Sequence, residues 1–289
     1  MHHEGLIIRP PSEADSILLQ VTLGCTHNAC AFCGAYKAKR FAIKPEATVR
    51  ADIAFAARHC RRIRRVFLCD GDALSIPHDR LVALLVEVRA SLPWVARVAA
   101  YANARGLRRK TAAELAGLKA LGLHTVYMGL ESGDEATLAA MNKGVGRAAI
   151  VEQAGKLKAA GLRLSLTVIL GLAGAERSPE HARATAEALS EIDPDQAAAL
   201  SLMLVPGTPL FEEHAAGRFV LPGPAALLAE LRTLVAQTRL SGGLFFSNHA
   251  SNYLPLRLRL PRDRDAALLR IDAALAGRVA LRPEGMRGL

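Results

Sequence analysis

The sequence has few aromatic residues and no long apolar run, and each of these shortages excludes a class of protein. Aromatic residues make up 4% of the 289 residues, which is too few for an obvious platform on which nucleic-acid bases stack. The longest apolar run, Leu164–Ala175, is much shorter than the ~20 residues that a membrane-spanning helix needs. The opening residues, Met1–Glu4, are not a basic segment followed by an apolar one, which disfavours a secretory signal. We therefore expect a cytoplasmic protein with no membrane partner.

What is present indicates a folded protein with a basic surface. Hydrophobic residues make up 51% of the chain, which excludes a disordered or collagen-like protein. There are 37 Lys and Arg against 27 Asp and Glu, a net charge of +10, which permits a nucleic-acid partner. Nucleic acid is not the favoured partner, because the excess is mostly Arg spread along the chain. The Arg-rich stretch Arg58–Arg65 is interpreted as a solvated helix end.

Apolar, nearly continuous runs alternate with helical patterns from about residue 15 to residue 205. Continuous apolar runs are typical of parallel strands covered on both faces. The predicted strands are Ile17–Leu23, Arg65–Cys69, Val95–Tyr101, Thr125–Leu130, Leu164–Leu170 and Ala199–Leu204. The predicted helices are Pro45–Cys60, His78–Ser91, Thr111–Leu121, Asp134–Met141, Arg147–Ala160, Pro179–Ile192, Ala225–Leu240 and Arg264–Ala276. Thr111 followed by Glu114 predicts a capping box, and Ser178 before Pro179 predicts a helix N-cap.

Six strand-then-helix units in a row predict a parallel sheet with right-handed crossovers. Periodicity alone leaves two α/β architectures open, a doubly wound sheet and a partial barrel. Residues 206–289 contain two further helical patterns and no low-complexity linker, so we expect them to pack on the same domain.

Three of the five cysteines, Cys25, Cys30 and Cys33, lie within nine positions directly after the first predicted strand. Clustered thiolates need a bound cation, and soft thiolate ligands select zinc, cuprous copper or iron–sulfur clusters. A structural zinc site takes four ligands, and His27 could supply the fourth. A [4Fe–4S] cluster held by three thiolates has one iron left for another ligand. An odd number of cysteines in this arrangement disfavours a disulfide framework and favours a metal site.

This cysteine loop resembles that of the radical S-adenosylmethionine (SAM) superfamily. In that superfamily a CxxxCxxC loop after the first strand holds a [4Fe–4S] cluster whose free iron binds the amino and carboxylate groups of SAM. The Cys30-Ala31-Phe32-Cys33 half matches, including Phe32 before the last cysteine, whereas four residues rather than three separate Cys25 from Cys30. The resemblance implies that Cys25, Cys30 and Cys33 hold the cluster. It also implies a partial (β/α)6 TIM-like barrel at residues 1–205, with residues 206–289 as a C-terminal extension that closes the barrel and contributes to the substrate site.

The residues after the later strands extend the resemblance, since function in parallel barrels lies at the carboxyl ends of strands. By this resemblance SAM would be bound at the ends of four strands or in the segments that follow them, through Asp70, Gly71, Asp72, Asn103, Glu131, Lys143, Ile169 and Gly171, together with Phe32 of the cysteine loop. Asp70-Gly71-Asp72 falls where the superfamily holds the methionine amino group. Glu131 resembles a ribose or methionine ligand, and Lys143 could reach the SAM carboxylate. Each position alone also fits an ordinary turn or helix end.

Two segments lie beyond this common set. Residues 205–210 read Val-Pro-Gly-Thr-Pro-Leu, similar to a segment of radical SAM proteins related to oxygen-independent coproporphyrinogen oxidase and to elongator-type enzymes. Residues 245–253 carry many hydrogen-bonding side chains between two apolar stretches. A loop over the barrel mouth would place His249 and Tyr253 for proton transfer or substrate orientation; a polar turn fits equally well.

The resemblance implies an enzyme in which cleavage of SAM gives a 5′-deoxyadenosyl radical that abstracts hydrogen from a substrate. An external electron donor of flavodoxin or ferredoxin type would then be needed. A small-molecule substrate is favoured. A tRNA- or peptide-modifying member of the superfamily is the first alternative, which the charge supports and the absence of a further cysteine triplet weakens. A non-enzymatic zinc or iron–sulfur binding protein is the second.

Overall fold

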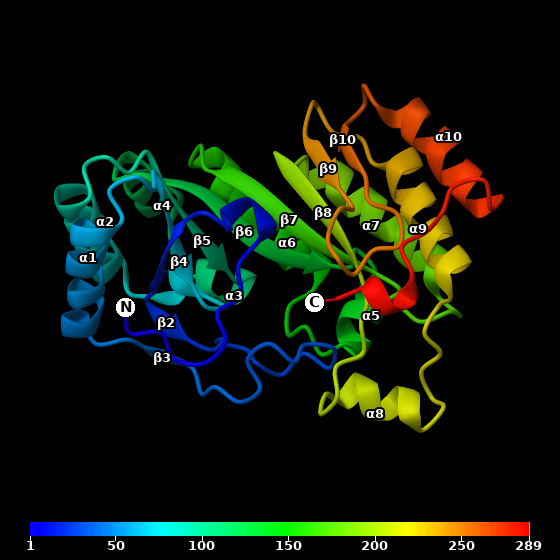
Figure 1. Cartoon of the computed structure of the whole chain (residues 1–289), viewed down its shortest axis with the longest axis horizontal. Helices are drawn as coiled ribbons and strands as arrows, with labels where there is room; N and C mark the ends of the chain where they lie inside the picture. Colours follow the sequence, from blue (N-terminus) through cyan, green and yellow to red (C-terminus); the bar gives the residue numbers. More distant parts are fainter. Residues whose placement is uncertain (289) are drawn as a thin grey trace. The chain divides into compact units, whose positions relative to one another are not determined.

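The structure is a computed structural model that describes residues 1–288, and Figure 1 shows its elements. The fold is α/β, with one mostly parallel sheet in the order β1-β4-β5-β6-β7-β8-β9-β10 and a separate two-stranded ribbon, β2-β3. This arrangement is consistent with a partial TIM-like barrel, as predicted. Within the described residues, no helix has the length and apolar character needed to cross a membrane.

The chain forms two compact units. Unit 1 comprises Met1–Asn28, Ala35–Met128 and Glu152–Leu164, and unit 2 comprises Ala29–Gly34, Gly129–Val151 and the chain from Ser165 onward. The chain passes between units within the cysteine loop, β6, α6 and β7. Residues 206–288, expected as a C-terminal extension, belong to unit 2 together with most of β7, α7 and β8.

Unit 1 contains the first half of the sheet. Its strands are β1 (Ile17–Gln20), β2 (Thr22–Leu23), β3 (Ala42–Ile43), β4 (Arg65–Cys69), β5 (Arg97–Ala102) and most of β6 (Leu123–Glu131). Its helices are α1 (Glu46–His59), α2 (His78–Ser91), α3 (Ala104–Leu107), α4 (Ala112–Ala120) and most of α6 (Arg147–Ala159), with 3-10 turns at Pro11–Glu13 and Ala73–Ser75. β1, β4, β5 and β6 pair in parallel, so the loops that follow β1, β4 and β5 share one edge of unit 1, whereas the end of β6 and the loop after it belong to unit 2.

Unit 2 contains the second half. Its strands are most of β7 (Arg163–Leu170), β8 (Gln196–Ser201), β9 (Leu244–Phe246) and β10 (Arg257–Arg259), and its helices are α5 (Glu135–Ala140), α7 (Ser178–Ile192), α8 (Pro209–Ala215), α9 (Pro224–Gln237) and α10 (Arg264–Leu275), with a 3-10 turn at Glu284–Met286. β7, β8 and β9 are parallel, and β10 is antiparallel to β9. α7 packs on α9 and α9 on α10, as Figure 1 shows.

Buried aromatic residues fill the interior of unit 1. Phe67 and Tyr127 are buried, and the Phe67 ring meets Tyr101 edge-on with 5.0 Å between the ring centroids. The Tyr127 hydroxyl donates a 2.8 Å hydrogen bond to the fully buried carboxylate of Glu13, which also pairs with Arg97 at 3.0 Å. A buried carboxylate needs such partners, so this network anchors the N-terminal segment to β5 and β6.

Several predicted boundaries are wrong, each for a local reason. The run Ile17–Leu23 is two strands, because Thr22–Leu23 pairs with β3 instead of continuing in the main sheet. β8 ends at Ser201, and the apolar residues Leu202 and Leu204 beyond it pack as loop residues in a core cluster. β9 and β10 went unpredicted because three residues carry too little periodicity.

Of the two predicted helix-start signals, one is confirmed and one is wrong. The capping box of Thr111 and Glu114 is confirmed, with the Thr111 side chain accepting from the Glu114 backbone N–H. Ser178 is not an N-cap: it lies inside α7, whose N-cap is Arg177.

Candidate functional site

Cys25 lies in unit 1, in the turn that follows β2, and two glycines, Gly24 and Gly71, pack closely around it. Gly24 before it has a φ of +69°, a left-handed conformation that glycine adopts without strain. Gly71, after β4, faces it so closely that a Cβ there would lie 2.9 Å from the Cys25 Cβ. The Asn103 side-chain amide, at the end of β5, is 3.9 Å from the Cys25 sulfur. Three predicted site residues, Cys25, Gly71 and Asn103, are therefore neighbours, and the Cys25 side chain remains half-buried.

The carboxylate of Asp70 anchors both ends of the unit 1 part of the cysteine loop. It is fully buried, and its Oδ2 accepts from the Gly24 N–H at 2.9 Å and from Lys39 Nζ at 3.1 Å. Gln20 adds a third bond at 3.2 Å. Asp70 itself has a φ of +68°, a strained conformation for a residue with a side chain, of the kind that clusters at functional sites.

The carboxylate of Asp72 ties the loop to the end of β5. It is fully buried and accepts from the Thr26 hydroxyl at 2.6 Å and from the Asn103 N–H at 3.0 Å. Burial raises the pKa of Asp72 to about 6, and the hydrogen bonds from Thr26 and Asn103 oppose that rise. The carboxylates of both anchoring aspartates, Asp70 and Asp72, are therefore occupied by hydrogen bonds within the protein.

Cys30 and Cys33 lie in unit 2, in a short turn held by backbone bonds. The Ala31 N–H donates to the Met141 carbonyl at 2.9 Å, and the Leu210 N–H donates to the Ala31 carbonyl at 3.0 Å. A Cβ on Gly34 would lie 2.5 Å from Val205 Cγ1, so that glycine is required for the close approach. The motif at residues 205–210 thus packs directly against this half of the cysteine loop.

Phe32 and Ile169 lie on the same apolar cluster of unit 2. Its buried members are Met141, Leu172, Leu202 and Leu210, and Phe32 and Ile169 pack on it half-buried. Partly exposed apolar side chains of this kind can cover the flat face of a ring system. The structure therefore places both predicted residues on one apolar cluster.

Glu131 and Lys143 form an ion pair in unit 2, with Lys143 Nζ 2.8 Å from Glu131 Oε1 and both side chains about one-tenth exposed (11% and 13%). Glu131 has a φ of +63°, and a Cβ on Gly129 would lie 1.9 Å from Glu131 Oε1. The Glu131 side chain thus folds back over Gly129 to meet Lys143. Glu131 and Lys143, which the sequence predicted as separate SAM contacts, therefore form one ion pair.

The backbone of Ile169–Gly171 is already used within unit 2. His181 Nε2 is 3.0 Å from the Ile169 carbonyl, and because a carbonyl only accepts, Nε2 carries the proton. His181 Nδ1 therefore accepts from the Ser132 hydroxyl, at 2.7 Å. The Gly171 N–H donates to Glu230 Oε2 at 2.7 Å. Burial lowers the pKa of His181 to about 4 and raises that of Glu230 to about 7.

The segment His249–Tyr253 is shaped by two arginines from the end of the chain. Arg282 Nη1 donates to the carbonyls of His249, Ala250 and Asn252 at 2.7–3.0 Å, and Arg287 Nε donates to that of Ser251 at 2.7 Å. The Tyr253 hydroxyl donates to Glu284 and accepts from Arg287.

This segment is also fixed to the carboxyl end of β8. The Asn252 side-chain oxygen accepts from the Ser201 hydroxyl at 2.9 Å, and its amide donates to the Ala199 carbonyl at 2.8 Å. Burial, and then the charge of Arg282, lowers the pKa of His249. The two predicted catalytic residues thus share one ordered loop at a strand end of unit 2.

Six residues of these networks were not predicted from the sequence: Thr26, Lys39, His181, Glu230, Arg282 and Arg287. Glu230 could have been found, because it is a lone acid among the leucines on the buried face of α9. Lys39 and Arg282 could not, since nothing local distinguishes them from other surface cations.

The chemistry of the three cysteine thiols in this loop fits an iron–sulfur cluster. Among residues 1–288 the structure contains no ready-made group of three or more His, Cys, Asp or Glu side chains that could hold a metal ion. The three thiols nonetheless lie on one loop, and the tight packing of Gly24 and Gly71 around Cys25 leaves that thiol beside Asn103. Thiolate donors of this number are what an iron–sulfur cluster with one open iron requires.

Comparison with known proteins defines the class. Residues 19–189 match the radical SAM superfamily, which is more than half of the chain. The chain therefore belongs to the radical SAM superfamily and is an enzyme of that class. Members of this superfamily generally use a [4Fe–4S] cluster and SAM. No curated protein sequence matches the chain.

Solved structures share the fold at low sequence identity. Methylornithine synthase PylB is 15% identical, with a TM-score of 0.55, over 77% of this chain and 63% of that one. Coproporphyrinogen III oxidase HemN from Escherichia coli is 16% identical, with a TM-score of 0.54, over 77% and 53%. The methyltransferase TsrM from Kitasatospora setae is 20% identical, with a TM-score of 0.57, over 92% and 54%. The matched part is thus less than two thirds of each of these chains, and the likeness concerns the fold.

Proposed function

We propose that this enzyme holds a [4Fe–4S] cluster through Cys25, Cys30 and Cys33 and binds SAM at the iron that no cysteine occupies. The observation that carries the proposal is the anchored cysteine loop, whose first ligand lies beside Gly71 and Asn103 at the carboxyl ends of β4 and β5. When bound, such a cluster would supply the electron that cleaves SAM to methionine and a 5′-deoxyadenosyl radical, and that radical would abstract hydrogen from a small-molecule substrate.

The chain's own residues would orient SAM. The anchoring aspartates fix the loop and keep the Gly71 backbone close to Cys25, with Asn103 beside it as a polar contact. The Glu131–Lys143 pair offers opposite charges, which suit the hydroxyls and the carboxylate of SAM. Phe32 and Ile169, with the turn at Gly171, offer an apolar surface for adenine. Residues 206–288 would close the substrate site, with His249 and Tyr253 as its polar contacts; residue 289, the last of the predicted extension, lies outside the described residues.

The favoured substrate class is a small molecule. The TsrM structure was solved with tryptophan and a SAM analogue bound, so the fold can hold both kinds of ligand. In this chain the ordered His249–Tyr253 loop carries one half-buried imidazole and one buried phenol, a set suited to orienting a compact polar substrate.

The test is SAM cleavage by the reconstituted enzyme. After anaerobic loading with ferrous ion and sulfide, addition of dithionite and SAM is expected to yield 5′-deoxyadenosine and methionine, measured by liquid chromatography and mass spectrometry. The matched control is Cys60→Ala, which removes a cysteine outside the loop and is expected to retain the products. Stoichiometric zinc and no cleavage in the wild type would instead identify a zinc protein.

Asp72 offers a second test, which separates an anchoring role from direct contact with SAM. Asparagine can still accept from the Asn103 N–H and donate to the Thr26 oxygen, so Asp72→Asn is expected to keep the cluster and SAM affinity near wild-type values. Asp72→Leu keeps neither bond and is expected to lower cluster retention under a chelator about 10- to 100-fold. A tenfold loss of SAM affinity in Asp72→Asn with intact iron content would show that the carboxylate contacts SAM.

A further inference from the structure

We infer that the face of unit 1 around Cys25 is a docking surface for an acidic one-electron donor protein, a flavodoxin or a ferredoxin. The inference rests on the proposed function, because a cluster that cleaves SAM must be reduced from outside. It adds the place on the chain where that donor binds and the charges that attract it. The basic docking surface is defined here as Lys37, Arg40, Arg105, Arg108 and Arg109.

The two segments that surround Cys25 carry charge of one sign. Residues 24–43 contain Lys37, Lys39 and Arg40 and no Asp or Glu, and residues 103–110 contain three arginines and Lys110, again with no Asp or Glu. All five residues of the basic docking surface are exposed. The carboxylates of Asp70 and Asp72, which lie between the segments, are fully buried. The exposed charges of these two segments are therefore all positive, and the nearby exposed acid, Glu4, is paired with Lys44 at 3.3 Å.

Contacts within unit 1 bring both segments to Cys25. Arg105 Nη1 is 2.8 Å from the His27 ring, two residues beyond the cysteine. Lys37 Nζ donates to the Asn28 carbonyl at 3.1 Å. Asn103, which begins the second segment, approaches the Cys25 sulfur itself. A partner held by these cations would thus sit against the half-exposed side of the first cluster ligand.

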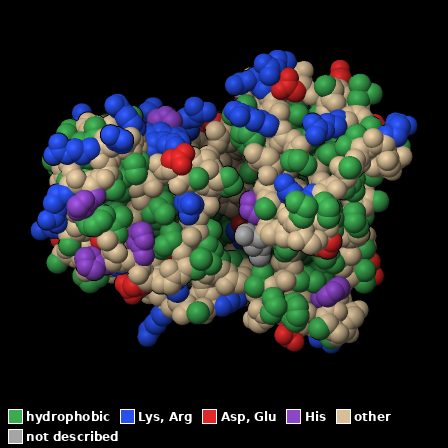
Figure 2. All heavy atoms as spheres, viewed as in Figure 1, with side chains coloured by type: hydrophobic (Ala, Val, Ile, Leu, Met, Phe, Trp, Pro, Cys, Tyr) green, Lys and Arg blue, Asp and Glu red, His purple; other side chains and the backbone are tan. Residues whose placement is uncertain are grey.

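Electrostatics selects an acidic partner. Complementary charge raises the rate of encounter by 10- to 1000-fold and orients the two surfaces, and the net charge of +10 attracts the same partner from a distance. Across the visible faces of both units, Lys and Arg side chains are also more frequent than Asp and Glu (Figure 2).

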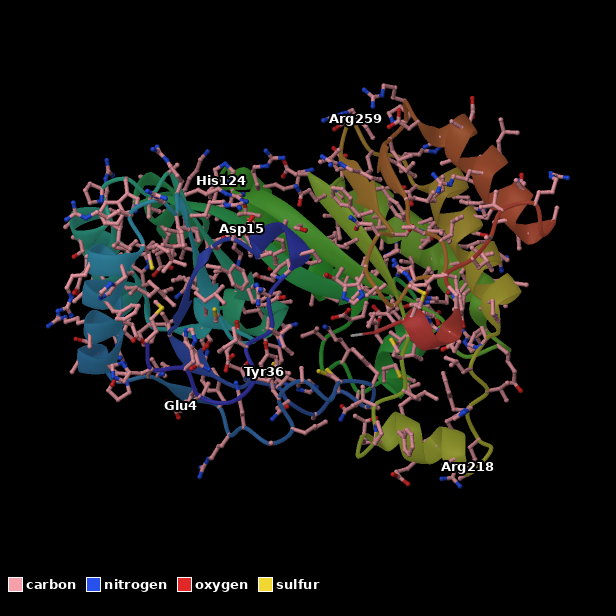
Figure 3. The ribbon with its side chains drawn as sticks, in the orientation of Figure 1. Glu4, Asp15, Tyr36, His124, Arg218 and Arg259 are labelled. Atoms are coloured by element: carbon pink, nitrogen blue, oxygen red, sulfur yellow. The ribbon has the colours of Figure 1, made fainter. Side chains whose placement is uncertain are left out.

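A protein donor fits this surface better than a nucleic acid does. Stacking of bases needs exposed aromatic rings, and the two segments offer none. Tyr36, labelled in Figure 3, is only 8% exposed, and Phe41 is half-buried. Phe32 is also half-buried, and it packs on the apolar cluster of unit 2. Cation density beside a redox ligand, without stacking rings, is the pattern that an acidic redox protein requires.

A matched pair of charge reversals tests the inference. Arg40→Glu with Arg108→Glu reverses two exposed cations of the basic docking surface, neither of which contacts the anchoring aspartates. Arg62→Glu with Arg64→Glu makes the same change in net charge just before β4, at the opposite end of that strand from Asp70. Binding of oxidised flavodoxin to each cluster-loaded chain is measured by calorimetry at low and high salt. Cluster reduction by reduced flavodoxin or by dithionite is followed by stopped-flow absorbance.

The first double variant is expected to bind flavodoxin at least about tenfold more weakly at low salt and to be reduced by it correspondingly more slowly. The control should remain within about twofold of wild type, and dithionite should reduce all three chains equally. Equal losses in both double variants, or no loss in either, would overturn the inference while leaving the proposed function intact. So would bulk tRNA that binds this surface and excludes flavodoxin. Wild-type chain that takes up no cluster but still binds flavodoxin through this surface would instead contradict the proposed function.

Discussion

Replacing Cys25, Cys30 or Cys33 with alanine is expected to leave the reconstituted enzyme without its cluster, with iron content falling from about four per chain to near zero. Each thiolate is one of three ligands, and a metal site that loses a ligand loses the binding free energy that assembles it. SAM cleavage should fall below detection in all three variants. Iron and sulfide analysis and the visible absorbance of the cluster provide the measurement.

The matched control for these variants is Cys60→Ala. Cys60 lies at the C-terminal end of α1, half-buried and away from the cysteine loop, so its replacement should leave iron content and SAM cleavage unchanged. If Cys60→Ala loses the cluster as completely as the three loop variants do, the assignment of ligands is wrong.

Replacing Glu230 with glutamine is expected to stabilise the chain above pH 7, by up to roughly 3 kcal/mol. Burial raises the pKa of Glu230 from 4.5 to about 7. Between these values the folded chain keeps a proton that the unfolded chain has released, so wild-type stability falls as pH rises from about 4.5 through 7. The difference between the two pKa values converts to roughly 3 kcal/mol. Glutamine cannot ionise, yet its oxygen can still accept from the Gly171 N–H.

The measurement is the free energy of unfolding in urea at pH 5 and pH 8. The difference between Glu230→Gln and wild type should be small at pH 5 and large at pH 8. His181, whose pKa is lowered by burial to about 4, also weakens the fold as pH falls below 6.5, and its Nε2 lies 3.8 Å from Glu230 Oε2. At pH 8 His181 is neutral in both proteins, so the difference at that pH reports on Glu230. Glu176→Gln, at an exposed position of the same unit, should match wild type at both values. A difference for Glu230→Gln that does not change with pH would show that the carboxyl is not held protonated in the folded chain.

The order of elements and the cysteine loop could be predicted because their signals are local. Continuous apolar runs predicted the bounds of β4 and β7 to within one residue. The capping box was predicted from Thr111 and Glu114 alone, two residues three positions apart. The end of β8 could not be predicted, because Leu202 and Leu204 are buried by packing in a core cluster, and apolar character does not separate that from strand pairing.

The roles of polar residues were harder to predict because they depend on partners distant in sequence. Asp70 and Asp72 look like ligands for an ammonium group until Gly24, Thr26 and Asn103 are seen to take up their oxygens. The Ile169–Gly171 backbone looks available until His181 and Glu230 are found bonded to it, the latter from a helix some 60 residues later. Sequence motifs locate such a site, whereas long-range hydrogen bonds decide which atoms remain for a ligand.

The electron paramagnetic resonance spectrum of the reduced, reconstituted enzyme, recorded with and without SAM, reports directly on whether SAM reaches the cluster. We expect the signal of a reduced [4Fe–4S] cluster, and a change in its shape when SAM is added, because SAM would bind the iron that lacks a cysteine. An iron–sulfur signal that SAM leaves unaltered, or a colourless chain that gives no signal, would contradict the proposed function.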